Sequence, residues 1–376
     1  MNDLSTRFAP DWVSPPGDTL LDMLEERGWT HAELAERLDY SPKHVSLLIN
    51  GKVTLSEDAA QRLSSVLGAP VGFWLTREAQ YRERLATLGA QARFAAWVDW
   101  LDRIPLRELM KCGAVAKRRV DAKAKPGLVA DCLAFFGVAS PPAWEARYGA
   151  MQPQFRRSRK EQSNLGAISA WLRLGEQEAE KLEIMRYDEA AFRQALIDMR
   201  ALALLQPEEF GLRLQFLFAQ AGVVFVMVPA LAGSHVSGVA RWLSPTRPLI
   251  QLSLYGKTND KFWFTLFHEA AHIVLHGGEK KSVYLDDPGH SSANFDRTNQ
   301  HEREANEWAR DWLIPPHAAS ELVALKKTRQ AVRDFAARHA IHPGVVVGRL
   351  QHDALIPISW MNDLKVTCSI AAVSAG

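Results

Sequence analysis

The stretch FWFTLFHEAAHIVLHGGE, residues 262–279, carries the sharpest signal in the sequence. His268 and His272 stand at positions i and i+4, so on a helix both imidazoles project from one face. The apolar residues around them predict a largely buried helix, in which two histidines and a glutamate are costly without partners. The spacing suits two of the roughly tetrahedral ligands of zinc. The other interpretation is a set of core histidines with hydrogen-bond partners and no metal.

Glu269 directly follows the first of these histidines. From there its carboxylate reaches a water on the metal rather than the metal itself. A metal ion lowers the pKa of such a water toward neutrality, and a nearby carboxylate takes the proton as hydroxide forms. The HExxH pattern carries this mechanism, although a five-residue pattern also arises by chance. We therefore predict Glu269 as the general base.

A catalytic zinc site takes three protein ligands and leaves the fourth position to water. The third ligand is expected on the helical segment HEREANEWARDWLIPP, residues 301–316, which begins 29 residues after His272. On that helix Glu302 lies close to the apolar face, whereas Glu304 points more to the side. We predict Glu302 as the third ligand, with Glu304 as the alternative. Asn306, one turn on, is expected to hydrogen-bond a ligand histidine.

The two segments HEAAHIVLHG and EREANEWARDWLIP resemble the ImmA/IrrE family of metallopeptidases, whose pattern is HExxHxxxHG…ExEANxFAxxLLxP. The resemblance covers about residues 200–320, and Trp308 stands where phenylalanine is usual. It implies a zincin-like peptidase domain with a zinc ion (Zn2+) as cofactor. It also implies the roles of four residues, with His268, His272 and Glu302 as metal ligands and Glu269 as general base.

His276 continues the i+4 series beside Gly277 and Gly278. A protonated histidine is favoured at the negative end of a helix dipole, so we interpret His276 as structural or as a hydrogen-bonding neighbour of the ligands. The sequence does not identify a residue that stabilises the tetrahedral oxyanion. Four side chains are candidates for that role: Tyr255, Tyr284, His290 and Arg297.

Short apolar stretches before this helix predict a small β-sheet. Residues 222–229 are β-branched and bounded by glycine and proline, which indicates a buried strand. Residues 239–242 and 248–254 predict two further strands, and a long helix is expected from about Asn259. Related zinc peptidases bind substrate as an extra strand beside a sheet edge, and residues 249–254 are the expected edge. The predicted fold class is mostly α with a small β-sheet, that is, α+β.

Residues 18–85 show helical periodicity in short pieces. Thr30 and Glu33 form a capping box before the helix HAELAERL. Ser41 and Pro42 then offer an N-cap and a first-position proline for a helix that continues with KHVSLLIN. A short helix, a tight turn and a second helix with a polar outer face is the geometry that lays one helix in the major groove of DNA.

The segment LLDMLEERGWTHAELAERLDYSPKHVSLLINGK, residues 20–52, resembles the helix-turn-helix of the XRE/Cro family. The following LGAPVGFWL, residues 67–75, is similar to HigA-type antitoxins. The resemblance implies a five-helix bundle that binds an operator in double-stranded DNA. Its implied contacts to bases, phosphates or backbone are Ser41, Lys43, His44, Ser46, Asn50 and Lys52. The alternative is a helical bundle used for protein contacts.

The net charge of +2 over 376 residues conceals an uneven distribution. Residues 14–85 hold 8 basic and 11 acidic side chains, whereas residues 91–166 hold 14 basic and 7 acidic ones. The acidic balance of the first segment counts against DNA binding, since affinity rests on phosphate neutralisation. A few basic residues on one helix suffice if a homodimer doubles them. A homodimer also fits because two-fold symmetric operators are usual for such modules.

The cysteine count and the N-terminus bear on the cellular compartment. Cys112, Cys132 and Cys368 are odd in number and form no CxxC pair, so neither a disulfide framework nor a cysteine-based zinc site is indicated. The N-terminal residues have no apolar core of signal-peptide type, and no run of 18 apolar residues occurs. We expect a cytoplasmic protein with no membrane partner.

Four regions follow from these patterns. We predict an XRE-type helix-turn-helix domain at 1–88, a basic helical linker at 89–166, an ImmA/IrrE-like zinc metallopeptidase domain at 167–320 and a C-terminal helical cap at 321–376. The resemblances imply a transcriptional regulator whose endopeptidase domain cleaves a repressor or antitoxin-type protein in stress response, toxin–antitoxin control or phage defence. The alternative is a non-proteolytic HigA-like antitoxin or repressor that binds a cognate toxin, with the metal domain as sensor or binding platform.

Overall fold

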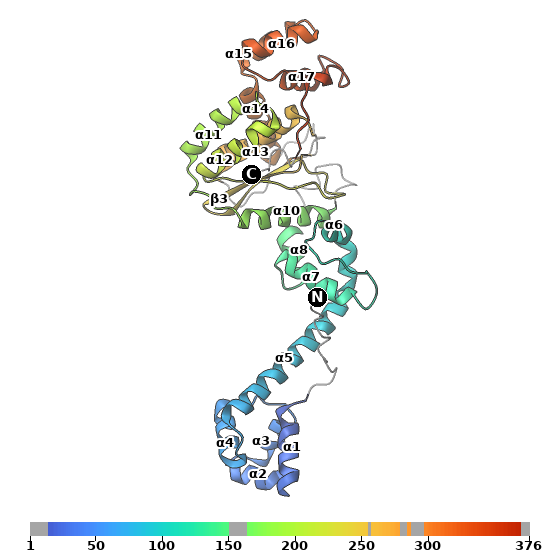
Figure 1. Ribbon diagram of the computed structural model, residues 1–376, viewed down its shortest axis with the longest axis vertical. Coiled ribbons are helices and arrows are strands. Elements are labelled where there is room, and N and C mark those ends of the chain that lie inside the picture. Colours follow the sequence, from blue (N-terminus) through green and yellow to red (C-terminus); the bar gives the residue numbers. More distant parts are fainter. Residues whose placement is uncertain (1–13, 150–163, 255–256, 279–283, 287–296, 370–376) are drawn as a thin grey trace. The chain divides into compact units, whose positions relative to one another are not determined.

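The computed structural model describes residues 14–149, 164–254, 257–278, 284–286 and 297–369. These residues fall into two compact units. The first runs to Val98 and includes Lys125–Gly127, and the second contains Asp99–Ala124 and the chain from Leu128 on. Helices dominate both units, and the described strands form one small sheet (Figure 1). The predicted fold class, mostly α with a small β-sheet, is confirmed.

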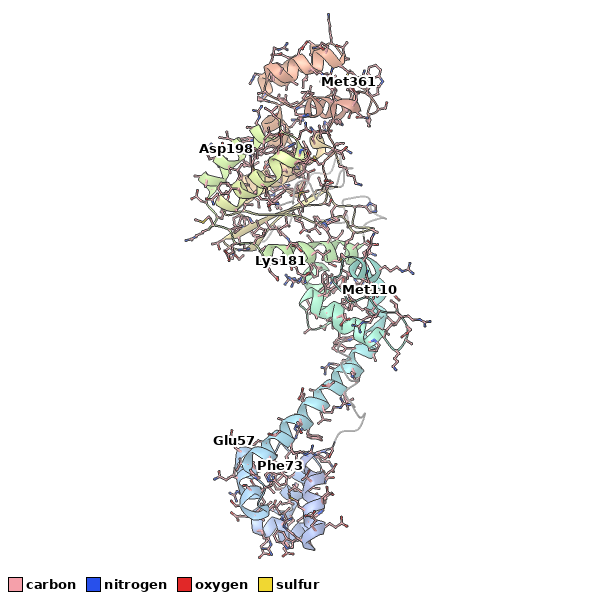
Figure 2. The ribbon with its side chains drawn as sticks, in the orientation of Figure 1. Glu57, Phe73, Met110, Lys181, Asp198 and Met361 are labelled. Atoms are coloured by element: carbon pink, nitrogen blue, oxygen red, sulfur yellow. The ribbon has the colours of Figure 1, made fainter. Side chains whose placement is uncertain are left out.

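The first unit contains a bundle of helices built from local signals. Thr30 caps its second helix by accepting a hydrogen bond from Glu33 N at 3.2 Å, and Ser41 caps the third by accepting from His44 N at 3.2 Å. Apolar side chains at helical spacing meet inside the bundle. Glu57 begins its fourth helix, and Phe73 lies in the first turn of its fifth (Figure 2). The helices are α1 (Pro16–Arg27), α2 (His31–Leu38), α3 (Pro42–Ile49), α4 (Glu57–Leu67) and α5 (Val71–Ala96).

Short helices with an aromatic core follow. The elements are η1 (Val98–Arg103), α6 (Leu106–Lys111), α7 (Lys125–Phe136) and α8 (Pro141–Gly149). Trp100, Phe136 and Trp144 meet edge to face with ring centroids 5.7–6.2 Å apart. Among the described residues, only Lys125–Gly149 is long and apolar enough to cross a membrane by length and composition. That stretch is divided between α7 and α8, and its large aromatic side chains are buried in this core.

The sheet has the strand order β1-β3-β2-β4. β1 (Val224–Met227) pairs parallel with β3 (Arg247–Leu252), and β2 (Gly238–Ser244) pairs antiparallel with both β3 and β4 (Tyr284–Asp286). The prediction that residues 249–254 form a sheet edge is wrong. β1 occupies the side of β3 that β2 leaves open, so the backbone groups of β3 are hydrogen-bonded on both sides.

The two faces of the sheet carry different side chains, because successive residues of a strand point to opposite sides. Arg241 and Gln251 point to the face covered by α10 (Leu165–Glu180), where Gln251 Nε2 donates to Trp171 O at 2.7 Å. Ala240 and Ile250 belong to the other face, which packs on α13 in the main apolar core (Figure 1). Helices α11 (Glu189–Leu202) and α12 (Pro207–Gln220) complete this second layer.

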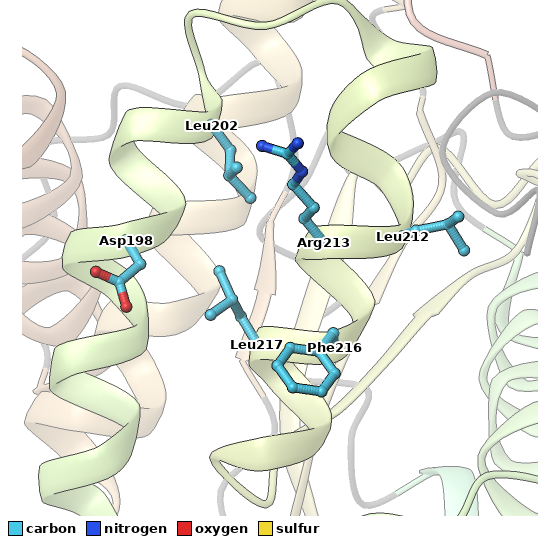
Figure 3. Close-up of a pocket in the computed structure, with 6 residues that line it drawn as sticks. All are labelled: Asp198, Leu202, Leu212, Arg213, Phe216 and Leu217. Carbon is cyan, nitrogen blue, oxygen red and sulfur yellow. The ribbon is translucent and has the colours of Figure 1, made fainter.

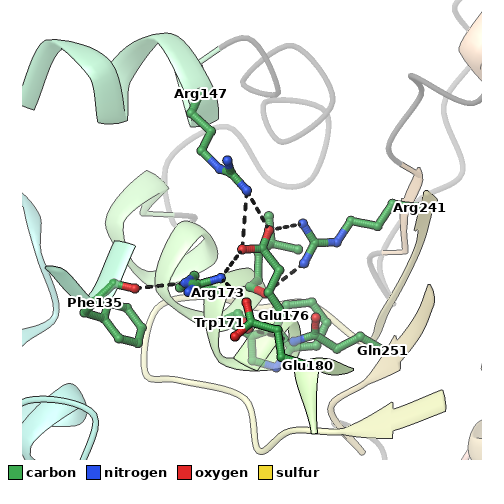
Figure 4. Close-up of polar contacts among 9 residues, drawn as sticks. Phe135, Arg147, Trp171, Arg173, Glu176, Glu180, Arg241 and Gln251 are labelled. Carbon is green, nitrogen blue, oxygen red and sulfur yellow. Dashed lines mark hydrogen bonds and ion pairs between the residues drawn. The ribbon is translucent and has the colours of Figure 1, made fainter. Parts of the chain in front are cut away.

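A buried ion-pair network fixes α10 on the sheet (Figure 4). Glu176 of α10 accepts from Arg241 of β2 at 2.8 Å, from Arg173 at 2.9 Å and from Arg147 of α8 at 3.2 Å. Burial alone would raise the pKa of the Glu176 carboxyl, but the guanidinium of Arg241 and its two neighbours lower it below its ordinary value. Glu176 is therefore ionised and joins three elements of the second unit.

The long helix α13 (Asn259–His276) begins at the predicted residue and packs against α14 (Arg297–Leu313). The C-terminal elements α15 (Pro316–Ala324), α16 (Arg329–Arg338), α17 (Pro343–His352) and η2 (Asn362–Leu364) follow. They hold the first turn of α13 through two polar contacts. The side-chain amide of Asn259 meets His342 Nδ1 at 2.9 Å, and Lys365 pairs with Asp260 at 2.7 Å.

Candidate functional site

The histidine-bearing helix α13 is buried along most of its length, because it lies between the sheet and α14. His268, Glu269 and His272 are buried on it, as the apolar pattern predicts. The i, i+4 spacing sets the imidazole rings of His268 and His272 with their centroids 4.8 Å apart and nearly perpendicular. Their Nε2 atoms lie 3.1 Å apart, so both rings present a nitrogen to the same point.

Glu302 of α14 reaches this point from the opposite helix. Its carboxylate oxygens lie 3.3 Å from His268 Nε2 and 3.5 Å from His272 Nε2. One ligand atom from each of the three residues falls within 4.8 Å of the others. Two ligand atoms on a tetrahedral zinc ion, each about 2.0–2.1 Å from it, are roughly 3.3 Å apart. The separations and the two-imidazole, one-carboxylate donor set therefore fit a zinc ion.

The protonation states also suit a metal. Burial lowers the pKa of His272 to about 4, so its imidazole is neutral and keeps a lone pair at pH 7. Burial alone would raise the pKa of the Glu302 carboxyl, but hydrogen bonds from His268 and His272 lower it well below its ordinary value. Metal ligands must be deprotonated, and the neutral imidazole of His272 and the ionised carboxylate of Glu302 meet that condition.

Two further contacts orient His272 through its Nδ1 atom, on the side of the ring away from Nε2. Its Nδ1 lies 3.2 Å from His276 Nδ1, and His276 Nε2 lies 2.9 Å from a carboxylate oxygen of Glu304. With His272 Nε2 turned to the metal point, its Nδ1–H donates to His276, whose Nε2–H donates to Glu304. Burial lowers the pKa of His276, which keeps that ring neutral and able to accept. Glu304 thus contacts His276, and Glu302 is the carboxylate at the histidine pair.

The general-base candidate Glu269 lies against the first residue of β2. A Cβ atom on Gly238 would come within 2.5 Å of Glu269 Oε1, so only glycine leaves room for the carboxylate. Gly238 is not among the site residues predicted from the sequence. Its position could have pointed to it, because it directly precedes Val239 at the start of a predicted strand. A glycine in a strand often marks the close approach of another group.

Other predicted site residues have different outcomes. Asn306 is exposed on α14, and in the described part of the chain it makes no hydrogen bond to His268 or His272. The prediction that it holds a ligand histidine is therefore not supported, because one step beyond buried Ala305 turns the side chain about 100° toward solvent. Of the oxyanion candidates, Tyr255 and His290 lie outside the described residues, as do the side chains of Tyr284 and Arg297.

The second helix of the helix-turn-helix, α3, presents a polar outer face. The side chains of Val45, Leu48 and Ile49 are buried in the bundle. The predicted DNA contacts lie on the opposite side, where Ser41, Lys43, Ser46, Asn50 and Lys52 are exposed and His44 is half-buried. His44 packs edge to face on Tyr40 with ring centroids 4.6 Å apart.

Two of these residues have structural contacts as well. Ser41 caps α3, and Asn50 donates from its side-chain amide to Ser46 O at 2.7 Å. Lys43 makes no ion pair within the described residues, so its ammonium is available to a phosphate. The exposed face of α3 is therefore polar and carries a cation near its N-terminus.

Models of two known protein families match this chain, one in its N-terminal part and one in its C-terminal part. A family model described as helix-turn-helix matches residues 20–74, which contain α1 to α4 and the start of α5. A model described as IrrE N-terminal-like domain matches residues 223–351, which contain the sheet, α13 and α14. No curated protein matches the chain significantly. The first match implies DNA-binding regulation and the second a metallopeptidase-like domain. The chain thus joins an XRE-type helix-turn-helix domain to an IrrE-like domain of the ImmA/IrrE metallopeptidase type.

Proposed function

We propose that this protein is a DNA-binding transcriptional regulator whose IrrE-like domain is a zinc-dependent endopeptidase. The observation that carries the proposal is the convergence of His268, His272 and Glu302 with the buried carboxylate of Glu269 on the same helix. Two buried imidazoles beside a partly buried carboxylate have little structural use without a cation. Glu269 directly follows His268 on the same helix, and we assign its buried carboxylate to proton transfer.

In the proposed peptide hydrolysis, the zinc ion and the side chains of the protein have separate roles. A bound zinc ion would act as a Lewis acid on the scissile carbonyl and on the attacking water. The Glu269 carboxylate would accept the proton that this water loses as its oxygen bonds to the carbonyl carbon. The resulting carboxyl group would give that proton to the leaving amine nitrogen when the C–N bond breaks. His276 and Glu304 would hold His272 in the tautomer that turns Nε2 to the ion.

The substrate is proposed to be a protein of the repressor or antitoxin type, bound in extended form beside the sheet. β3 is internal, and in the described part of the sheet β1 and β4 are the outer strands. β4 pairs with β2, the strand whose Gly238 contacts Glu269, so it is the outer strand nearer the chemistry. We therefore assign substrate addition to the β4 side. The biological setting proposed is stress response, toxin–antitoxin control or phage defence.

The regulator half would bind an operator in double-stranded DNA through α3, as a homodimer in the cytoplasm. Lys43, Ser46, Asn50 and Lys52 are exposed for this purpose. Because the module as a whole is acidic, its affinity would depend on these few contacts doubled by symmetry.

Cleavage of a partner tests the peptidase. The full chain, loaded with zinc, would be incubated with the repressor or antitoxin encoded beside it, and fragments would be identified by mass spectrometry. We expect cleavage by the natural protein and none by Glu269→Gln, which keeps the three ligands. Equal cleavage by both proteins would contradict the mechanism.

A non-proteolytic HigA-like antitoxin or repressor is the second candidate function. The complete burial of His268 favours it, since an ion enclosed there would exchange slowly and suits a binding platform for a toxin. In that case zinc removal would change operator or toxin binding, and Glu269→Gln would behave like the natural protein. Binding assays on both proteins, with and without a chelator, separate the two functions.

A further inference from the structure

The helices α11 and α12 form a hairpin whose outer face is apolar. Their inward residues, among them Leu196, Phe210 and Phe218, fill the main core. Their outward residues are also large and apolar, with Phe216 62% exposed and Leu212 57% exposed. Ile197 on α11 and Leu204, just after the end of that helix, are exposed as well. Scattered exposed apolar residues need no explanation, but a contiguous apolar face on a helix pair marks an interaction surface.

This face is hollowed between the two helices (Figure 3). The groove has a volume of about 390 Å³. Leu202 and Leu217 point into it (Figure 3), and Phe216 stands exposed beside it. The same face therefore offers both a hollow and protruding apolar side chains. The groove is lined by Asp198, Leu202, Leu212, Arg213, Phe216 and Leu217.

One charge of each sign borders the groove. Asp198 lies on α11 and Arg213 on α12 (Figure 3). Within the described chain no ion pair joins either of them to another residue, and Asp198 only accepts a long hydrogen bond of 3.4 Å from Gln194. Both side chains are exposed. The borders of the groove are thus of opposite charge.

We infer that this face, the α11–α12 groove, binds a second copy of the same chain. In a two-fold symmetric contact, residue i of one copy meets residue j of the other, and j meets i. A two-fold axis through the groove brings Asp198 of one copy to Arg213 of the other twice, and it offers Phe216 of each copy to the groove of its partner. A hollow, a protruding aromatic ring and both charges on one patch make the patch complementary to itself.

This contact extends the two-copy arrangement proposed for operator binding and rests on that proposal, but its surface belongs to the second unit, whereas α3 belongs to the first. Oligomeric state in the absence of DNA tests the groove, and operator binding tests the regulator function. The two proposals can therefore fail separately. A protein that is monomeric without DNA but binds its operator would contradict the dimer contact at the groove and leave the proposed regulator function intact.

Analytical ultracentrifugation of the full chain, without DNA, is the experiment. We expect a concentration-dependent dimer for the natural protein and a monomer for Leu212→Glu/Phe216→Glu. Val323→Glu is the matched control, because Val323 is an exposed apolar residue on α15, and it should leave the dimer intact. Circular dichroism confirms that each variant is folded, as expected for exposed positions.

Charge reversal makes the test specific to the symmetric contact. Asp198→Arg and Arg213→Asp should each raise the dimer dissociation constant at least about tenfold, since like charges then face each other. The double variant restores opposite charges and should return the constant to within about threefold of the natural value. A natural protein that stays monomeric, a dimer that survives Leu212→Glu/Phe216→Glu, or a double variant no tighter than the singles would each overturn the inference.

Discussion

The carboxylate of Glu269 and the backbone of Gly238 are in contact across the helix–sheet interface. A Cβ atom on Gly238 would lie 2.5 Å from Glu269 Oε1 and 2.9 Å from both Leu252 Cδ2 and Thr265 Cγ2. The carboxylate therefore occupies space that any other residue at this position would fill. Since Glu269 is buried, it has no exposed position to which it can turn at small cost. The absence of a side chain at Gly238 thus allows the carboxylate of Glu269, the proposed general base, to take this position.

We predict that Gly238→Ala lowers peptidase activity by roughly tenfold or more, since a displaced general base loses part of a contribution of about 10²–10⁴-fold. Zinc content should stay at that of the natural protein, because the atoms nearest to the added Cβ belong to Glu269, Leu252 and Thr265 and not to the three ligands. Gly278→Ala is the matched control, as a Cβ there would meet nothing within 4 Å. Full activity in Gly238→Ala, measured as the cleavage rate with metal content determined in parallel, would contradict this role.

The two carboxylates of α14 are predicted to differ in their effect on metal content. Glu302→Ala removes a proposed ligand, so the purified protein should lose zinc and the melting-temperature rise that zinc gives. Glu304→Ala removes the carboxylate that contacts His276 and Gln300 but no proposed ligand, so zinc should remain bound with affinity lowered by about 10–100-fold. Elemental analysis and competition with a chelator measure both quantities. Zinc loss in Glu304→Ala together with full retention in Glu302→Ala would reverse the assignment.

How far the sequence predicts this site depends on how local each relationship is. The start of α13 at Asn259 and the shared face of His268 and His272 follow from periodicity within one helix. The capped helices of the helix-turn-helix follow in the same way. The central position of β3 could not be predicted from the sequence, because it depends on pairing with β1 across the 19 intervening residues 228–246 and not on the composition of β3. Strand order is a property of the assembled sheet.

Contacts between helices could not be predicted from the sequence either. The i+4 series placed His276 on the metal-facing side of α13, but nothing in the sequence paired it with Glu304 on α14. The error on Asn306 has the same origin, since a helix projection gives an angle but not the distance to a neighbouring helix. Gly238 could not be predicted as a site residue, because a glycine has no side chain with which to bind a metal or transfer a proton. Its importance appears only when Glu269 from α13 packs against it.

The buried network around Glu176 predicts a specific acid dependence of stability. Its folded-state pKa lies below its ordinary value of 4.5, so ionised Glu176 stabilises the fold above that pH, and the contribution is lost as pH falls through the lower folded-state pKa. Glu176→Gln should lower the melting temperature at neutral pH, and its difference from the natural protein should shrink below about pH 4.5. Glu180→Gln is the control, since this exposed carboxylate of the same helix pairs only with Arg173 among the described residues. A pH-independent difference between Glu176→Gln and the natural protein would show that charge is not the cause.

The DNA-binding half predicts a change in salt dependence. Lys43 is exposed on the outer face of α3, so a phosphate contact there should release a counterion on binding. In a gel-shift or anisotropy titration on the promoter of its own gene, Lys43→Ala should weaken binding and lower the slope of log K against log salt by about 1 per copy. Lys181→Ala removes the same charge from the second unit, where the side chain pairs with Glu178, and should leave the slope unchanged. Equal slopes for the natural protein and Lys43→Ala would remove Lys43 from the interface. In that case Ser46 and Lys52, on the same exposed side, become the residues to substitute next.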